Sequence, residues 1–365
     1  MKKIIALIMA AGALVACSGK GYVIDGTVAH AADGDIVYLM ENPNLAPTDS
    51  AVVKGGAFRI KGSETDGSAR YLVYNMEDPA TLAYAKFYQE EGKMTAELKK
   101  NADGVPSIVK GTPVNDAVSE YAAKQAEFEN KLNSLSEKYD AASDEEKAAI
   151  DKESEEIEKQ YYANIENAID KLIGSAAGVE LLSSNYYSME PEKVLDLIGK
   201  IPAGLREDNE RLDRIEESVK KQLETAPGKK FTDFTMKTPE GKDISLSDYA
   251  GKGKLVLVDF WASWCGPCVR EMPNVKKTYE AFHKKGFEIV GVSLDRDEQA
   301  WKDGIARLGM TWPQMSDIKY WDCEGAALYG VSSIPATVLI GPDGTIIERN
   351  LRGDALYNKV AALLK

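Results

Sequence analysis

Two cysteines spaced three positions apart, shortly after an apolar run, constrain the fold of this chain more than any other feature. Residues 255–258 read Leu-Val-Leu-Val, which predicts a buried strand, and Cys265 and Cys268 follow in the run Trp-Cys-Gly-Pro-Cys. This spacing lets the two sulfurs close a small ring when oxidised, and it leaves Cys265 able to attack another disulfide when reduced. The pair is therefore predicted to be a redox centre.

A helix is expected to begin at Cys265, because Pro267 then lies in the first turn, where its missing N–H costs nothing. The helix dipole and the free N–H groups would stabilise the Cys265 thiolate and lower its pKa, at about 1.36 kcal/mol for each pKa unit. Trp264, Gly266 and Pro267 are predicted to form part of the surface that a substrate meets beside the sulfurs.

Length and charge set broad limits on the function. The chain has 365 residues, 44% of them hydrophobic, which is enough for two or three packed domains. Its net charge of -13 argues against a nucleic-acid partner, whose phosphates are bound by basic surfaces.

Residues 1–17 are predicted to be an export signal. Lys2 and Lys3 precede an apolar run of about 13 residues, which is too short to span a bilayer. Residues 14–17, Leu-Val-Ala-Cys, resemble a bacterial lipobox, and this resemblance implies that Cys17 is lipidated after cleavage. We therefore expect a protein of the cell envelope, on the periplasmic side, that is anchored to a membrane surface by acyl chains. The alternative is an ordinary secretory signal that happens to end in a cysteine.

The remaining cysteine, Cys323, has no second cysteine nearby in the sequence and is expected to be a bystander thiol. In an oxidising envelope Cys265 and Cys268 become a disulfide unless a donor reduces them, so a membrane or envelope electron donor is an expected partner. No cofactor is expected beyond this redox-active disulfide. No metal site is expected either, since His30 and His283 are the only histidines and the cysteine pair lacks a second ligand pair.

Residues 21–113 consist of short β-rich runs separated by turn residues, which predicts a small antiparallel β-sandwich. Gly55 and Gly56 predict a hairpin turn between two of these runs. The segment resembles the β-rich module of unassigned function that precedes thioredoxin-like domains of the envelope, and the resemblance implies a binding or docking role. The expected strands are 22–24, 36–39, 51–53, 57–60 and 70–74.

Residues 114–226 change to a helical period. Apolar side chains recur at alternating steps of four and three from Val114 to Tyr139, and Ser143 with Glu146 forms a capping box for a second helix that extends to Leu172. Two such helices with a short connection predict an antiparallel hairpin. The region is interpreted as a spacer, with a dimerisation or substrate-clamping surface as the alternative. Further helices are expected over 179–187, 191–198 and 205–223.

Residues 228–365 alternate strand and helix, which predicts an α/β sheet with helices on both faces. Residues 258–273, VDFWASWCGPCVREMP, resemble the active-site segment of the TlpA/ResA-type thioredoxins, which are membrane-tethered thiol-disulfide oxidoreductases with a redoxin or AhpC/TSA-like domain. Residues 286–295, GFEIVGVSLD, resemble the central strand of that family, and residues 301–321 fall where the family carries an insertion. The resemblance implies a thioredoxin fold and thiol-disulfide exchange.

Residues 331–340, VSSIPATVLI, resemble the cis-proline strand of the same family, which implies a cis bond between Ile334 and Pro335. A cis bond before proline costs only about 0.5–1 kcal/mol. In this position Pro335 would leave the backbone of Ile334 free to pair with a substrate strand beside Cys265.

Two carboxylates accompany the dithiol. Asp259 lies in an apolar run, so burial is expected to raise its pKa and allow it to act as a base. The resemblance implies that such a base deprotonates the resolving thiol, Cys268, and that many family members carry a glutamate where Glu271 stands. We assign Asp259 as the base and Glu271 as a residue that tunes the thiols. The alternatives are the reverse assignment and a Glu271 that pairs with Lys or Arg on the helix face.

The main prediction is an envelope thiol-disulfide oxidoreductase that reduces the disulfides of exported client proteins. Cys265 attacks the client and Cys268 resolves the mixed disulfide. The resemblance implies roles such as apocytochrome c maturation and general thiol repair. One alternative is a thiol peroxidase, although the Thr-x-x-Cys motif of that class is absent. Another is a binding or assembly lipoprotein in which the cysteine pair is a passive clip.

Overall fold

The computed structural model describes residues 21–364, so the predicted export signal (residues 1–17), with Cys17, lies outside the described residues. The chain forms two compact units, of which the first ends at Glu180 and the second begins at Leu181. No helix between residues 21 and 364 is long and apolar enough to cross a membrane.

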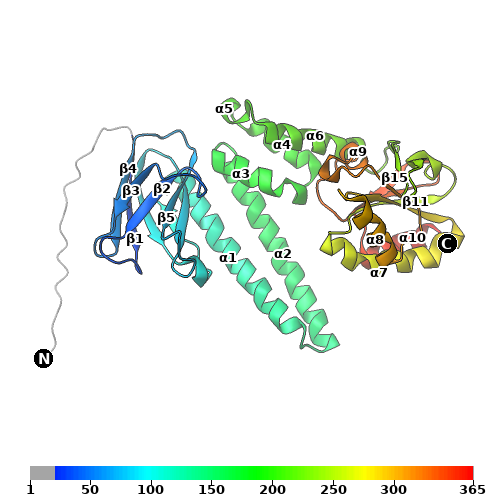
Figure 1. Ribbon diagram of the computed structural model, residues 1–365, viewed down its shortest axis with the longest axis horizontal. Coiled ribbons are helices and arrows are strands. Elements are labelled where there is room, and N and C mark those ends of the chain that lie inside the picture. The colour runs from blue at the N-terminus through cyan, green and yellow to red at the C-terminus, as the bar shows by residue number, and fades with distance from the viewer. Residues whose placement is uncertain (1–20, 365) are drawn as a thin grey trace. The chain divides into compact units, whose positions relative to one another are not determined.

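The first unit begins with two four-stranded sheets that enclose one core (Figure 1). The strands are β1 (Tyr22–Val28), β2 (Ile36–Met40), β3 (Asp49–Val52), β4 (Ala57–Gly62), β5 (Ala69–Tyr74), β6 (Ala83–Tyr88), β7 (Gly92–Leu98) and β8 (Ile108–Lys110). One sheet has the order β4-β1-β7-β8 and the other β3-β2-β5-β6. Ile24 of the first sheet and Leu72 and Phe87 of the second are fully buried between them. Side chains alternate between buried and exposed along β1 and β7, as expected for strands with one face on a core.

Two details differ from the predicted antiparallel sandwich. β1 and β7 are paired in parallel, because the strands that intervene in the chain supply the long crossover that a parallel pair needs. Gly55 and Gly56 do form a tight turn with positive φ angles of 58° and 74°, closed by a bridge between Lys54 and Ala57. The strands on either side, β3 and β4, belong to different sheets, so the turn is a corner between sheets and not a hairpin.

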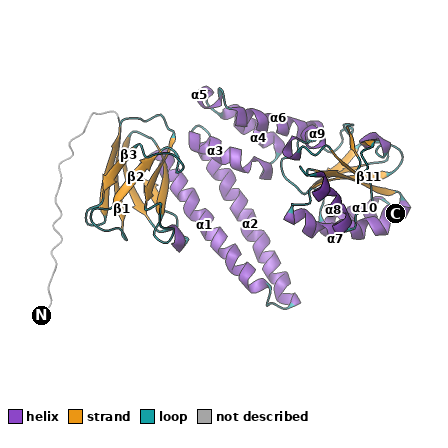
Figure 2. Cartoon of the chain, viewed as in Figure 1, coloured by secondary structure: helices purple, strands orange, loops and turns teal. Residues whose placement is uncertain are grey.

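Helices α1 (Pro113–Tyr139) and α2 (Asp144–Leu172) pack side by side as the predicted hairpin (Figure 2). The capping box is confirmed: the Ser143 side chain accepts the N–H of Glu146, and the Glu146 carboxylate accepts the N–H of Ser143 at 2.8 Å. Next along the chain come α3 (Ala176–Asn185), the 3-10 turn η2 (Tyr186–Ser188) and α4 (Pro191–Lys200).

The helix predicted over residues 205–223 is in fact two helices, α5 (Ala203–Arg206) and α6 (Glu210–Glu224). Asp208 between them adopts a positive φ of 56°. The side chain of Asn209 accepts the N–H of Leu212 and so starts a new helix. The prediction was wrong because the apolar spacing continues across this break.

The second unit contains a seven-stranded sheet of order β10-β9-β13-β12-β11-β14-β15 among the residues described. β11, β12 and β13 run parallel, while β14 is antiparallel to β11. Every residue of β11 and β12 is buried, which explains why their sequences lack the alternation of a half-exposed strand. The strands are β9 (Thr235–Lys237), β10 (Asp243–Ser245), β11 (Leu255–Trp261), β12 (Phe287–Ser293), β13 (Gln314–Ser316), β14 (Ala336–Ile340) and β15 (Ile346–Arg349).

Helices cover both faces of this sheet, as the alternation of strand and helix predicts. α7 (Gly266–Phe282) and α10 (Gly353–Leu363) pack together on one face, and α9 (Glu324–Leu328) lies on the other (Figure 1). α8 (Glu298–Leu308) connects β12 to β13. Residues 301–321 therefore contain most of α8 and the strand β13.

α6 packs onto the loop that precedes β14, at Gly330. The side chains of Ser218 and Gln222 both donate to the carbonyl oxygen of Gly330, at 3.3 and 2.8 Å. A Cβ on Gly330 would lie 2.2 Å from the carbonyl oxygen of Ser218, and the φ of Gly330 is +59°. A residue without a side chain is needed for this approach. α6 thus packs on elements that follow residues 226–228, where the sequence predicts a domain boundary, and that boundary stays a prediction.

Replacing Gly330 with Ala should weaken the second unit more than replacing Gly253, which also has positive φ but has open space around it. Both variants incur the cost of a left-handed alanine, about 1–2 kcal/mol, and only Gly330→Ala adds a steric clash worth roughly 1–3 kcal/mol. Urea unfolding followed by tryptophan fluorescence measures both. Equal losses of unfolding free energy in the two variants would contradict the packing described for α6.

Candidate active site

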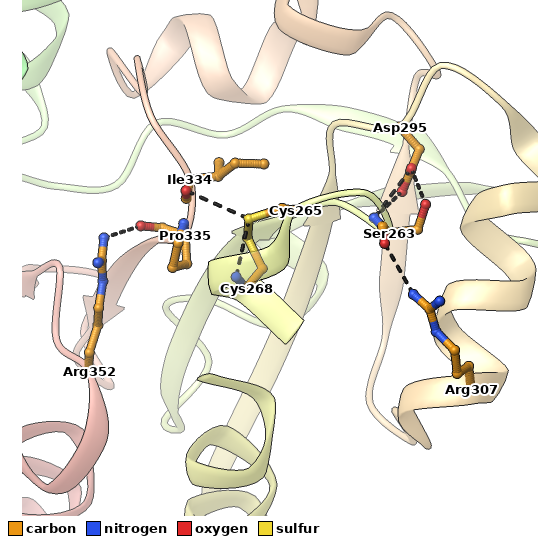
Figure 3. Close-up of a disulfide and its surroundings, with 8 residues drawn as sticks. All are labelled: Ser263, Cys265, Cys268, Asp295, Arg307, Ile334, Pro335 and Arg352. Carbon is orange, nitrogen blue, oxygen red and sulfur yellow. Dashed lines mark hydrogen bonds between the residues drawn. A yellow bond between two sulfur atoms is a disulfide. The ribbon is translucent and has the colours of Figure 1, made fainter. Parts of the chain in front are cut away.

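The two cysteines of the Trp-Cys-Gly-Pro-Cys run form a disulfide at the start of α7. Their Cα atoms lie 5.3 Å apart. Cys265 is the N-cap residue of α7, Gly266 is its first residue, and Pro267 lies in its first turn, as predicted. The N–H of Cys268 donates to the Sγ of Cys265 at 3.1 Å (Figure 3). The attacking sulfur therefore receives a backbone donor from the positive end of the helix.

The predicted cis peptide bond between Ile334 and Pro335 is confirmed. The carbonyl oxygen of Ile334 lies 3.7 Å from the Sγ of Cys265 (Figure 3). In the disulfide this is a contact only, because the sulfur carries no proton, whereas the reduced thiol could donate to it. Ile334 and Pro335 directly precede β14, so the segment that enters this strand lies beside the sulfur of Cys265.

Asp259 is buried in β11, with 3% of its surface exposed. Its Oδ2 atom has no hydrogen-bond partner among the described residues. Burial, with the negative charge of Glu271 as a second cause, raises the pKa of Asp259 to about 7, and Arg352 partly opposes the rise. An acid with this pKa can exchange a proton near neutral pH.

Glu271 links α7 to the start of α10. Its Oε1 accepts the N–H of Gly353 at 2.6 Å, and its Oε2 accepts a hydrogen bond from Nδ2 of Asn274 at 3.1 Å. The carboxylate therefore caps the N-terminus of α10, where negative charge is stabilised. Both carboxylate oxygens are used by Gly353 and Asn274, and no Lys or Arg among residues 21–364 forms an ion pair with Glu271, which disfavours pairing on the helix face. Its proposed effect on the thiols would pass through Asp259, whose pKa it raises.

Arg352 was not identified from the sequence, yet it contacts two parts of the site. Its guanidinium donates to the carbonyl oxygen of Pro335 (Figure 3). Its positive charge also favours the ionised form of Asp259. Arg352 therefore connects the cis-proline loop, the N-terminus of α10 and the buried carboxylate.

A second carboxylate network holds the turn between β11 and Cys265. Asp295, which follows β12 and is almost fully buried, accepts the N–H and the hydroxyl of Ser263, at 3.0 and 2.6 Å. Ser293 donates to the same carboxylate. Figure 3 shows Arg307 donating to the carbonyl oxygen of Ser263. The turn that carries the sulfurs is thus fixed from the neighbouring strand.

Aromatic side chains flank the disulfide on its exposed side. Trp264 is 46% exposed, and its ring centroid lies 5.1 Å from that of Tyr320 and 6.2 Å from that of Trp321. Trp261, in contrast, is buried in the core and donates to Gln314. Of these tryptophans, Trp264 and Trp321 are the ones that an incoming molecule can contact.

Cys323 is a free, fully buried thiol at the start of α9. Burial raises its pKa to about 11, so at neutral pH it is almost wholly protonated and a poor nucleophile. This environment agrees with a bystander role. No group of three or more His, Cys, Asp or Glu side chains that could hold a metal ion occurs in the described part of the chain.

The structure brings together most residues that the sequence predicted for the site and adds several others. Cys265, Cys268, Ile334 and Pro335 meet at the sulfurs, with Asp259 buried in the adjoining strand. Of the additional residues, Asp295 had a recognisable signal, since it ends an apolar run that predicts the neighbouring strand. Arg352 and Ser263 had none.

The raised pKa of Asp259 predicts a pH dependence of stability that an Asp259→Asn variant should lose. The folded state binds this proton up to about pH 7, whereas the unfolded chain releases it near its ordinary value of 3.8. The stability that this residue contributes is therefore complete at low pH and is lost as the pH rises toward 7, by roughly 4 kcal/mol. Relative to the wild type, the oxidised Asn variant should gain unfolding free energy between pH 4.5 and pH 8.

Urea unfolding of the oxidised chain measures this difference, because all five tryptophans lie at or after Trp261 and report the second unit. Arg352→Gln is the matched control. It keeps Asp259 but removes the opposing cation, so the steep part of the wild-type profile should move to higher pH. If the Asn variant and the wild type differ by the same amount at pH 4.5 and pH 8, Asp259 does not have a raised pKa.

Comparison with known proteins agrees with this geometry. Residues 227–349 match the AhpC/TSA family, and residues 22–118 match a family described as Domain of unknown function (DUF4369). The thiol-disulfide oxidoreductase ResA of Bacillus anthracis is 36% identical over 138 residues, which are 38% of this chain and 76% of that protein. ResA of Bacillus subtilis is 34% identical over 121 residues, 33% of this chain and 65% of that protein.

The crystal structure of the thioredoxin domain of a thiol-disulfide oxidoreductase from Bacteroides vulgatus is 39% identical, with a TM-score of 0.36, and the match covers 38% of this chain and 99% of that one. The sequence match to ResA covers three quarters of the Bacillus anthracis protein. Through its C-terminal domain, the chain therefore belongs to the ResA-type family of thioredoxin-fold thiol-disulfide oxidoreductases.

Proposed function

We propose that this enzyme reduces disulfides of exported client proteins in the cell envelope. One observation carries the proposal: the Sγ of Cys265 lies at the N-terminus of α7, receives the N–H of Cys268, and adjoins the carbonyl of Ile334 before the cis proline. A helix N-terminus favours a thiolate, and a free backbone carbonyl beside it can pair with a bound polypeptide.

The reaction begins from the reduced dithiol. The thiolate of Cys265 attacks one sulfur of the client disulfide, so a bond forms between Cys265 and that sulfur while the client S–S bond breaks. The second client sulfur leaves as a thiolate and takes a proton. The product is a mixed disulfide between enzyme and client.

Cys268 completes the reaction. Asp259 accepts the proton of the Cys268 thiol, directly or through water, and the resulting thiolate attacks the Sγ of Cys265. The bond to the client breaks, the client leaves as a dithiol, and the enzyme keeps the disulfide of the present structure. Two electrons have passed from enzyme to client. The raised pKa of Asp259, about 7, supports its role as the proton acceptor.

Repeated turnover needs a donor that returns two electrons to the Cys265–Cys268 disulfide. A membrane or envelope dithiol protein fits this requirement, because it can reduce the enzyme disulfide by the same exchange chemistry. Clients and donor would use the same face, since Cys265 is only 4% exposed and must be reached past Trp264 and Ile334.

The place of action follows from the predicted export signal at residues 1–17. The same prediction has Cys17 carry a lipid anchor that holds the enzyme at a membrane surface on the periplasmic side. Reduced thiols of exported apocytochromes c, which must be free before haem attachment, are one client class that this chemistry would serve.

A Cys268→Ser variant should accumulate mixed disulfides with its clients, because Cys265 can still attack but nothing resolves the product. Non-reducing electrophoresis of envelope extracts measures this as bands that dithiothreitol removes. The double variant Cys265→Ser/Cys268→Ser should form none of them, and Cys268→Ser/Cys323→Ser should form them all. If Cys268→Ser gives no reducible species, or if Cys265→Ser/Cys268→Ser gives the same species as Cys268→Ser, attack by Cys265 is disproved.

A further inference from the structure

The edge strand of one sheet in the first unit has backbone groups that no other strand uses. β6 is the last strand in the order β3-β2-β5-β6. Gln89, just after β6, forms backbone hydrogen bonds with Gly67 and Ser68, which precede β5. The N–H and C=O of Tyr88 point the other way and bond to the side chain of Asn115. Successive residues of a strand alternate in this respect. The N–H and C=O groups of Tyr84 and Lys86 therefore point away from β5.

This open edge is short and closed at both ends. Asn115 occupies the end at Tyr88, with both hydrogen bonds at 2.8 Å. At the other end the carbonyl oxygen of Leu82 accepts the N–H of Asn101. No strand within residues 21–364 pairs with the stretch between these ends. It offers two N–H donors and two carbonyl acceptors in the spacing of a β-ladder.

The open edge lines a cavity of about 490 Å³. One wall is β6 from Tyr84 to Lys86, the loop 104–107 forms a second, and Tyr121 and Gln125 of α1 form a third. Tyr161 of α2 completes the lining. Aromatic walls beside an open strand edge suit an occupant with alternating side chains.

A buried amide also lines this cavity. Asn164 donates to the Oε1 of Gln125 at 2.8 Å, which orients the amide and assigns Nε2 as its other end. Nε2 is buried and makes no hydrogen bond of good geometry with the described residues, although the Tyr121 hydroxyl is close enough to interact with Gln125. Leaving such a donor unpaired costs about 1–3 kcal/mol. Burial raises the pKa of the neighbouring Tyr121 to about 12, so its hydroxyl stays protonated and is a further donor.

We propose that this cavity binds an extended polypeptide segment of another protein, which adds as a strand to the open edge of β6. A polypeptide supplies alternating donors and acceptors at about 3.3 Å per residue, which is what the backbone groups of Tyr84 and Lys86 require. α1 and the loop 104–107 bound the space beside this edge. A carbonyl of the segment would accept from the hydroxyl of Tyr121, which lines the cavity. The site uses neither thiol, so it is independent of the disulfide chemistry.

The experiment measures binding of a fluorescein-labelled, cysteine-free peptide of alternating Val and Thr residues, flanked by lysines, to the full chain by fluorescence anisotropy. Tyr84→Pro removes one outward N–H donor and leaves the ladder to β5 intact, since proline is tolerated on an edge strand when its nitrogen faces away from the sheet. Tyr84→Ala removes the same side chain but keeps the donor. Tyr84→Pro should weaken binding by at least about tenfold, and Tyr84→Ala by less than about threefold.

Circular dichroism and thermal unfolding establish that both variants keep the fold, and disulfide reduction by the enzyme should be unchanged in both. Three results would overturn the proposal: equal affinity of Tyr84→Pro and Tyr84→Ala, no saturable binding of this peptide or of reduced carboxymethylated α-lactalbumin, or a dimer of the chain that only Tyr84→Pro dissociates. The last result would mean that the edge pairs with a second copy.

Discussion

The junction between β11 and α7 determines the chemistry of this protein, because it fixes where the attacking sulfur lies and which charges surround it. β11 is an internal strand that is buried along its whole length, and α7 begins immediately after the turn at its C-terminal end. The turn is held by Ser263 and Asp295, and its last residue, Cys265, caps the helix. The N–H of Cys268 in the first turn then donates to the sulfur, and the Ile334 carbonyl adjoins it from the cis-proline loop.

Much of this junction could be predicted from the sequence. Features that depend on local spacing were predicted correctly: the buried strand at 255–258, the helix start at Cys265 and the capping box at Ser143. The cis bond before Pro335 was inferred through the resemblance to a family and is present. The burial of Asp259 followed from its apolar neighbours, and its raised pKa followed from burial.

Features that depend on long-range packing could not be predicted. Arg352 reaches the site only because α10 packs against α7, and nothing near it in the sequence signals this. Parallel pairing of β1 and β7 depends on which strands of the segment enter which sheet. The sequence signal of the turn at Gly55 is the same whether the turn joins two strands of one sheet or two strands of different sheets. The break at Asp208 was missed because a periodic pattern does not show where a helix stops.

The reduction potential of the Cys265–Cys268 pair shows most directly whether this pair donates electrons to clients. The potential can be measured by equilibrating the chain with dithiothreitol or glutathione buffers and quantifying the oxidised fraction. A pair that donates electrons to clients should have a value near that of thioredoxin, about -270 mV. A value near that of the strong oxidant DsbA, about -120 mV, would contradict electron donation to clients, because such a pair would oxidise client thiols.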